Sequence, residues 1–266
     1  MFSDDKNCAS ISKYLRHGDN VYFYETADST NAIAKTLGAK GEKEGTLVVA
    51  DKQTAGRGRL GRSFFSPDGG IYMSLLLRPQ IALQEALFIT AAAAVAVCHV
   101  IERETDKKCL IKWVNDIYID GRKVCGILTE GAVAGGETLE YAVLGIGINL
   151  TCPSGGFPQD IADRADAIFG NESISAEEKA RITAAVADEF LDIYSQLGSK
   201  SFMREYQSRS FLNGLTVCFN KDGIDHTAKV IAIDDDAKLI VEENGKKIAL
   251  DAGDVSVKPK RDNKKR

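Results

Sequence analysis

Residues 46–77 read TLVVADKQTAGRGRLGRSFFSPDGGIYMSLLL. The β-branched and apolar residues near both ends of this stretch predict strands over residues 46–51 and 71–77. Between them, residues 53–70 combine glycines with three arginines, and the FFSPDGG portion at residues 64–70 excludes a continuous helix. We therefore expect a long loop, rich in glycine and arginine, between two strands.

Strand and helix patterns continue on both sides of this loop. Before it, the capping side chains of residues 28–31 precede a short helical segment. Ser175 and Glu178 match a capping box, which predicts the start of a long helix. The expected elements are strands at 21–25, 110–114, 117–119, 123–130 and 141–149, and helices at 32–37, 84–104, 175–197 and 202–208. Their uneven interleaving predicts an α+β fold with a mixed, mostly antiparallel sheet.

The sequence changes character near its C-terminus, where short β-rich segments alternate with tight turns. These segments are residues 216–219, 228–233, 239–242, 247–251 and 255–257. Five short strands in so few residues predict a small β-barrel. We therefore expect a main domain over residues 1–211, a barrel over 212–258, and a basic, solvated, disordered tail over 259–266.

Composition excludes several classes of protein. The 266 residues are 44% hydrophobic and 27% charged, which is typical of a globular protein, and the net charge of −4 argues against a body that binds nucleic acid. The longest apolar run, residues 89–101, is shorter than the ~20 residues of a membrane-spanning helix. The N-terminus does not resemble a signal peptide, so we expect a cytoplasmic protein without membrane contact.

The cysteines and histidines of the sequence do not indicate a zinc site or a Ser-His-Asp triad. The six cysteines are scattered without CxxC pairs, so we expect reduced thiols. The three histidines lie far apart in the sequence, which leaves no obvious zinc site and no obvious Ser-His-Asp triad.

The loop sequence GRGRLGR at residues 56–62 matches G-x-G-x-x-G but lacks the context of a dinucleotide site. No helix follows it, no acidic residue stands about 20 residues later before Glu85, and no Gly-Lys-Ser/Thr marks a phosphate-binding P-loop. Two interpretations remain. The loop is either a solvated surface segment or a lid that closes over a polyanion, because arginine forks bind phosphate and carboxylate. With few apolar anchors, the empty loop is expected to be mobile.

Residues 111–116, IKWVND, place a lysine beside the single tryptophan. Strand alternation puts Lys112 and Val114 on one face and Trp113 on the other, with Lys112 either snorkelling at a sheet edge or serving a site. The glycines of GILTE (126–130) and GIGIN (145–149) weaken strands unless something lies close to the backbone. Asn149 either ends its strand or reads an adenine edge.

Five segments in this order resemble the catalytic domain of biotin–protein ligases. They are DSTN at 28–31, QTAGRGRLGR at 53–62, KWVND at 112–116, GILTE at 126–130 and GIGIN at 145–149. The resemblance implies an α+β fold like that of class II aminoacyl-tRNA synthetases, followed by a small C-terminal SH3-like β-barrel. It also implies two reactions: ATP and biotin form biotinyl-5′-AMP, and biotin then passes to a lysine of a biotin carboxyl carrier domain of a carboxylase. Mg²⁺ is expected with ATP.

The same resemblance assigns residues to roles. The catalytic residues it implies are Lys112 and Arg57. Biotin would contact Ser29, Thr30, Asn31, Gln53, Arg57, Gly58, Arg59, Lys112 and Gly126. ATP or the adenylate would contact Arg57, Arg59, Arg62, Phe64, Lys112, Asn115 and Asn149. The sequence assigns no metal ligands, although Asp116 is a candidate.

Two alternative functions remain for the same fold. A lipoate or octanoate ligase is disfavoured by Gln53 and the arginine loop, since an aliphatic acyl chain has no ureido group to bind. A catalytically silent biotin-binding regulator would tolerate the loss of Lys112, which is present here. The first 20 residues leave no room for a DNA-binding domain before the first predicted strand, so we expect a ligase that does not bind DNA. The oligomeric state stays open, a homodimer included.

Overall fold

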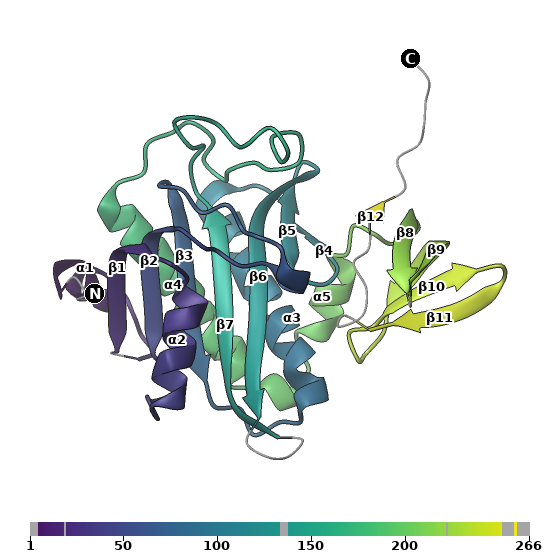
Figure 1. Ribbon diagram of the computed structural model, residues 1–266, viewed down its shortest axis with the longest axis horizontal. Coiled ribbons are helices and arrows are strands. Elements are labelled where there is room, and N and C mark those ends of the chain that lie inside the picture. Colours follow the sequence, from purple (N-terminus) through teal and green to yellow (C-terminus); the bar gives the residue numbers. More distant parts are fainter. Residues whose placement is uncertain (1–4, 19, 134–137, 222, 252–257, 260–266) are drawn as a thin grey trace.

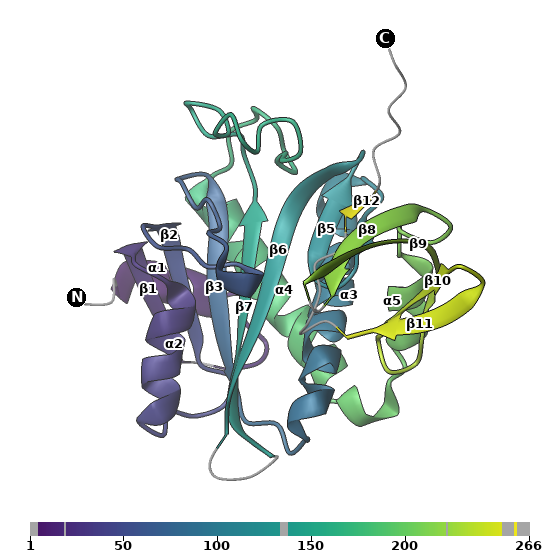
Figure 2. The same ribbon diagram turned by 45° about the vertical axis from the view of Figure 1, so that its right-hand side comes forward.

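A sheet of seven strands is the centre of the computed structural model, which describes residues 5–18, 20–133, 138–221, 223–251 and 258–259 (Figures 1 and 2). In sequence order its strands are β1 (Val21–Ala27), β2 (Leu47–Gln53), β3 (Gly70–Leu77), β4 (Leu110–Lys112), β5 (Asp116–Ile119), β6 (Arg122–Val133) and β7 (Leu139–Asn149). They lie side by side in the order β1-β2-β3-β7-β6-β5-β4. Strands β1 and β2 are parallel and the other neighbours are antiparallel, which confirms the predicted mixed sheet.

Helices cover both faces of this sheet (Figure 2). Helix α2 (Thr30–Ala39) packs on β2, β3 and β7. The other face carries α3 (Ala86–Thr105), which contacts α4 (Ala176–Tyr194) and α5 (Met203–Ser208), while α1 (Asp5–Ser12) packs on α4 and β1. Because strand side chains alternate between faces, every residue of β3 is buried between the two layers.

Helix α3 is long and apolar enough to cross a membrane by composition alone, yet 72% of its apolar window is buried inside the protein. It packs against the sheet and against two helices, so it is a core helix. A short 3₁₀ turn, Leu83–Glu85, precedes it. The start of α4 is also as predicted, because Ser175 Oγ accepts a hydrogen bond from the Glu178 backbone N–H at 3.2 Å.

The C-terminal strands form a second, antiparallel sheet. Its strands are β8 (Thr216–Lys221), β9 (Ile224–Ile233), β10 (Leu239–Glu243), β11 (Lys246–Leu250) and β12 (Lys258–Pro259), in the order β11-β10-β9-β8-β12. Within the described residues no pairing joins the edge strands β11 and β12, so a closed barrel is not formed there. The predicted strand at 255–257 and tail residues 260–266 lie outside the described residues, while Pro259 pairs with Val217 of β8.

Three sequence-based expectations need comment. Strand 110–114 was predicted two residues too long, because β4 ends at Lys112 and residues 113–115 form a turn with a cis peptide bond between Trp113 and Val114. Asn115 holds that turn to β6, since its carbonyl accepts from the Ile127 N–H at 2.9 Å and its Nδ2 donates to the Ile127 carbonyl at 2.7 Å. Helix α1 was not predicted. All six cysteines are free thiols, as expected.

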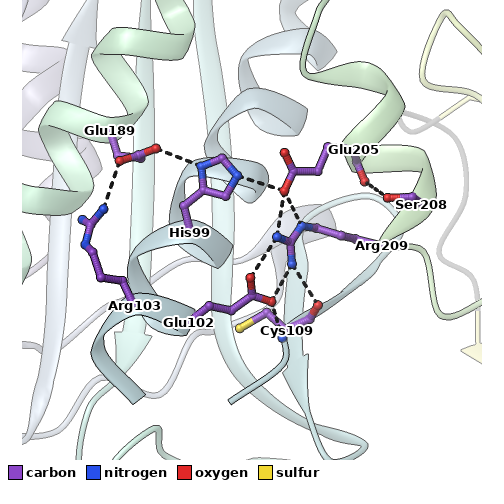
Figure 3. A network of polar contacts seen from close by, with 8 residues as sticks. All are labelled: His99, Glu102, Arg103, Cys109, Glu189, Glu205, Ser208 and Arg209. Carbon is purple, nitrogen blue, oxygen red and sulfur yellow. Dashed lines mark hydrogen bonds and ion pairs between the residues drawn. The ribbon is translucent and has the colours of Figure 1, made fainter. Parts of the chain in front are cut away.

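A polar network joins helices α3, α4 and α5 on one face of the sheet (Figure 3). His99 of α3 contacts Glu189 of α4 at 2.8 Å and Glu205 of α5 at 2.9 Å. Burial lowers the pKa of His99, but its hydrogen bonds to the two carboxylates outweigh burial and raise the pKa overall. Arg209 adds ion pairs to Glu102 at 2.6 Å and to Glu205 at 2.7 Å. The network therefore favours a protonated imidazole.

We expect His99 to make folding stability depend on pH. A histidine whose folded-state pKa is raised stabilises fully below its unfolded value of about 6.5, and this contribution is lost as the pH rises through the folded value. The melting temperature of the parent protein should therefore fall more steeply above about pH 6.5 than that of His99→Gln. Differential scanning fluorimetry across this range checks the difference. Parallel curves for the two proteins would contradict it, because Glu189 and Glu205 would then not raise the pKa of the imidazole.

Candidate functional site

A pocket of about 920 Å³, part of it open to solvent, lies on the α2 face of the sheet beyond the N-terminus of that helix. The ends of β2 and β4, the loop between β2 and β3, and strands β6 and β7 enclose it. Twelve residues expected in the site line this pocket. They are Ser29, Thr30, Asn31, Gln53, Arg57, Gly58, Arg59, Arg62, Phe64, Lys112, Asn115 and Gly126.

Asn149 is the predicted site residue that does not line the pocket. It stands at the end of β7, and its side-chain Nδ2 donates to the Asp166 carbonyl at 2.9 Å. That bond ties the end of β7 to the loop that follows. Its predicted contact with adenine remains a prediction.

The floor of the pocket is formed by glycines on two paired strands. Gly126 of β6 lies opposite Gly147 of β7. A Cβ atom at Gly147 would lie 2.5 Å from Phe64 Cε1, and one at Gly126 would lie 2.9 Å from Phe64 Cε2. A Cβ at Gly145 would lie 2.2 Å from Asn31 Oδ1. The group that requires these strand glycines is thus the protein's own Phe64 ring and Asn31 amide.

One end of the pocket is polar and its groups are fixed by one another. Gln53 Oε1 accepts from the Thr30 backbone N–H at 2.9 Å, and Gln53 Nε2 donates to Ser66 Oγ at 3.0 Å. The first N–H group of α2 is therefore capped by Gln53. Ser29 occupies the N-cap position without a side-chain capping bond, and it faces the pocket while only 3% exposed.

Asn31, on helix α2, is oriented by side chains of two strands, β3 and β6. Its Nδ2 donates to Glu130 at 2.8 Å, and the Ser74 hydroxyl donates to its Oδ1 at 2.6 Å. Burial raises the pKa of Glu130, but hydrogen bonds from Lys35 and Asn31 outweigh it and lower the pKa. The carboxylate therefore stays charged and fixes which way the Asn31 amide faces. Sequence reasoning missed Ser74, although a serine within the apolar run IYMSLLL was a usable signal.

The rest of the pocket is cationic. Its charged lining residues are Arg57, Arg59, Arg62, Lys112 and Lys123 on the positive side and Asp116 on the negative side. Arg59 Nη1 donates to Asn115 Oδ1 at 3.3 Å, and burial lowers the pKa of its guanidinium despite nearby Asp116. Arginine nonetheless stays protonated at neutral pH, so this desolvated cation favours an arriving anion.

Lys123 was not predicted as a site residue. Its Nζ lies 2.6 Å from Asp116 Oδ1 and 5.5 Å from the centre of the Phe64 ring. Within the described chain, no cluster of three or more His, Cys, Asp and Glu side chains could hold a metal ion. Asp116 is therefore one carboxylate in a cationic lining, and the pocket does not form a dedicated metal site from its own side chains.

The glycine–arginine loop is anchored at several points. The Gly58 N–H donates to the Arg62 carbonyl at 2.7 Å, and the Phe64 N–H donates to the Gly56 carbonyl at 2.9 Å. The Phe64 ring packs on the glycine floor and makes an edge contact with Tyr72, with 6.4 Å between ring centres. Phe64 is thus an apolar anchor of the loop, whereas Leu60 and Phe65 are exposed, which agrees with the expectation of few apolar anchors. The sequence does not show that Phe64 meets the glycines of β6 and β7.

Comparison with known proteins finds a family whose sequence pattern covers this pocket. The sequence pattern of the Biotin/lipoate A/B protein ligase family matches residues 22–149, a range that contains every lining residue of the pocket. Residues 22–149 are therefore similar to this family.

Individual members of the biotin/lipoate protein ligase family resemble longer parts of the chain. The bifunctional ligase/repressor BirA of Bacillus spizizenii is 45% identical over 152 residues, which cover 57% of this chain and 46% of that protein. The chain thus spans about half the length of the first curated relatives it matches. A biotin–acetyl-CoA-carboxylase ligase of Mycobacterium tuberculosis is 27% identical over 236 residues, 85% of each chain. The structure of biotin protein ligase from Aquifex aeolicus in complex with biotin and ATP has a TM-score of 0.76 at 26% identity, covering 91% of this chain and 100% of that one.

We expect Gly145→Ala to destabilise the protein. The added Cβ would displace the buried Asn31 amide from its bonds to Ser74 and Glu130, at a cost of about 1–3 kcal/mol in the free energy of unfolding. Gly155→Ala is the matched control, because a Cβ there meets no atom within 4 Å. Urea unfolding of both variants measures the difference. Equal stabilities would show that the glycine is not needed for the Asn31 contact.

Proposed function

We propose that this chain is an ATP-dependent biotin–protein ligase that makes biotinyl-5′-AMP and then transfers biotin to a lysine of a biotin carboxyl carrier domain. The observation that carries the proposal is a pocket with a polar end and a cationic end in a chain of net charge −4. Relatives named as biotin–acetyl-CoA-carboxylase ligases and a structural neighbour with bound biotin and ATP support it.

The first reaction joins two anions. A carboxylate oxygen of biotin attacks the α-phosphorus of ATP, the bond from that phosphorus to the bridging oxygen breaks, and pyrophosphate leaves with the electron pair. Repulsion between the carboxylate and the triphosphate opposes their approach, and negative charge builds up around the α-phosphate. Lys112, Arg57 and Arg59 line the same pocket and would offset both effects with preorganised positive charge.

The polar end suits the ureido ring of biotin, whose donors and acceptor need partners once buried. Ser29, Thr30, Asn31 and Gln53 supply hydroxyl and amide groups there. Ser29 is the best donor toward a ligand, because its hydroxyl faces the pocket and does not cap α2. Asn31 and Gln53 are held by protein partners, so they contribute oriented rather than mobile groups. An apolar lining residue such as Leu128, on the same strand face as Gly126, would contact the rest of the vitamin.

The nucleotide would occupy the cationic end. Phe64 offers an aromatic face for the adenylate, and Asn115 offers a lining amide for the base. A contact of Asn149 with the base stays part of the proposal, although Asn149 lies outside the lining. Arg62 and Lys123 line the same pocket and would contact the outer phosphates. Asp116 is the lining carboxylate that would hold Mg²⁺ bound to ATP, and the metal would offset negative charge on the phosphates.

In the second reaction the neutral ε-amine of the acceptor lysine attacks the carbonyl carbon of the adenylate, an amide forms and AMP leaves. Gly58 and the arginines of its loop would shield the mixed anhydride from water in the interval. We place the catalytic domain at residues 1–211, the C-terminal module at 212–258 and a basic tail at 259–266. We also infer a cytoplasmic location without membrane or DNA contact, and a carboxylase carrier domain as protein partner.

Pyrophosphate release separates this proposal from its nearest alternative. The purified chain should release pyrophosphate with MgATP plus biotin, far more slowly with MgATP plus lipoate, and should then label a biotin carboxyl carrier domain. A preference for lipoate or octanoate would assign the chain to the other acyl class of its family. Biotin binding without pyrophosphate release would instead indicate a silent regulator.

Lys112→Ala should lower the rate of adenylate formation by about 10²–10³-fold, as expected for one lost donor in the transition state. The dissociation constant for biotin should change much less, since most biotin contacts lie elsewhere in the pocket. Single-turnover pyrophosphate release and calorimetric titration with biotin measure the two effects. Lys229→Ala, on an exposed position of β9, is the control lysine variant. Unchanged turnover in Lys112→Ala would remove this residue from the mechanism.

Arg57→Ala should weaken retention of the intermediate. A loop that lacks this cation would hold the adenylate less tightly, so the intermediate should leave or hydrolyse faster than in the parent. Gel filtration of enzyme loaded with radiolabelled biotinyl-5′-AMP follows its release over time. Parental retention in this variant would contradict a closing role for the loop.

A further inference from the structure

The segment that carries Lys112 is held from behind by residues outside the pocket. We propose that Tyr206 and the turn at residues 234–238 are positioning elements that fix the Lys112–Asn115 segment for catalysis. We call these elements the brace. The kinetic consequences of this inference rest on the proposed function. The contacts of the brace can also be followed independently, by the fluorescence of Trp113.

The first brace contact comes from helix α5. The Tyr206 hydroxyl donates to the Val114 carbonyl at 2.8 Å, and the Tyr206 side chain is fully buried. Val114 lies two residues after Lys112, inside the turn that ends β4. A buried carbonyl that lost this donor would be left without its hydrogen bond, so the turn would shift to recover one.

The second brace contact comes from the C-terminal sheet. Trp113 Nε1 donates to the carbonyl of Ala237, which lies in the turn between β9 and β10, at 2.8 Å. Trp113 lines the pocket directly after Lys112, whereas Tyr206 and Ala237 do not line it. The C-terminal sheet thus reaches the site through the indole of Trp113.

Side-chain bonds within the turn fix the direction of the Ala237 carbonyl. Asp234 Oδ1 accepts from the backbone N–H groups of Asp236 at 3.0 Å and Lys238 at 2.8 Å. Ala237 has a φ of 59° and is completely buried. Asp234 therefore shapes the turn without touching the pocket.

Strand β4 needs such support because it is the last strand of its sheet. The Ile111 N–H donates to the Arg209 carbonyl at 2.8 Å, and the Phe211 N–H donates to the Ile111 carbonyl at 3.2 Å. Arg209 is itself fixed by Glu102 and Glu205 in the network of Figure 3. Residues after position 200 thus form hydrogen bonds to the outer edge of β4 and to the turn that follows it.

Precise placement of Lys112 matters for the proposed reaction, because a displacement of about 1 Å at a reacting group can cost about 10²-fold in rate. The brace does not contact the pocket contents, so its loss should lower kcat for adenylate formation more than it weakens biotin binding. If the brace contributed only to overall stability, its loss would lower the melting temperature without lowering kcat more than biotin binding.

The test uses two pairs of variants. Tyr206→Phe removes one hydroxyl from the brace, and Tyr141→Phe is its control, because Tyr141 donates a similar bond to the Lys35 carbonyl at 3.3 Å. Asp234→Ala loosens the turn, and Asp234→Asn keeps a side-chain oxygen that can accept the two N–H bonds. The Asp234 pair also excludes an effect through Arg59, which interacts electrostatically with Tyr206.

We expect kcat to fall about 10–10²-fold in Tyr206→Phe and Asp234→Ala, with near-parental rates in Tyr141→Phe and Asp234→Asn. Trp113 is the single tryptophan, so its fluorescence emission should shift in Asp234→Ala and return toward the parental value in Asp234→Asn. Parental kcat and emission in Asp234→Ala would overturn the brace. If the parent itself released no pyrophosphate with biotin, the proposed function would fail, and the emission shift alone would support or refute the brace.

Discussion

The antiparallel pairing of β6 with β7 is the constraint on which the rest of the site depends. Its register sets Gly126 opposite Gly147 and Leu128 opposite Gly145, so a strip of three glycines lies beside the Leu128 side chain in the middle of the sheet. Phe64 and Asn31 rest on that strip. A slip of one residue in β7 would turn its glycines to the core face and the side chains of Ile146 and Ile148 to the pocket face. The loop, the N-terminus of α2 and the β4–β5 turn all meet at this strip.

The site is also defined by its positive charge. Several arginine and lysine side chains converge on one pocket while the chain as a whole is acidic, so the local potential differs in sign from the net charge. Among the lining residues that the structure describes, Asp116 is the one carboxylate, and it lies against Lys123. Burial of Arg59 raises the free energy of a cation that has little water around it, and an anion that enters would reverse that cost. Such a pocket is organised before its ligands arrive.

Much of the fold and the site could be predicted from the sequence because the signals are local. The glycine–arginine spacing predicted the loop, the Ser175 capping box predicted the start of α4, and the strand glycines indicated the pocket floor. Each of these signals depends on the backbone conformation of a single short segment. What could not be predicted depends on contacts between distant segments. Phe64 anchors the loop only because two glycines from other strands lie beneath it. Lys123, Ser74 and Glu130 join the site through pairings across strands, and β4 ends early because Asn115 bonds to Ile127. The order of the described strands in the second sheet likewise depends on pairing that periodicity does not encode.

The central claim is that one cationic pocket holds the carboxyl end of biotin and the α-phosphate of ATP at the same time. A crystal structure with a non-hydrolysable analogue of biotinyl-5′-AMP tests this most directly. The account predicts that the linkage between the acyl group and the phosphate lies within hydrogen-bond distance of Lys112 and of at least one of Arg57 and Arg59, with the ureido ring beside Ser29. An analogue bound with its linkage away from all three cations, or elsewhere on the molecule, would contradict it.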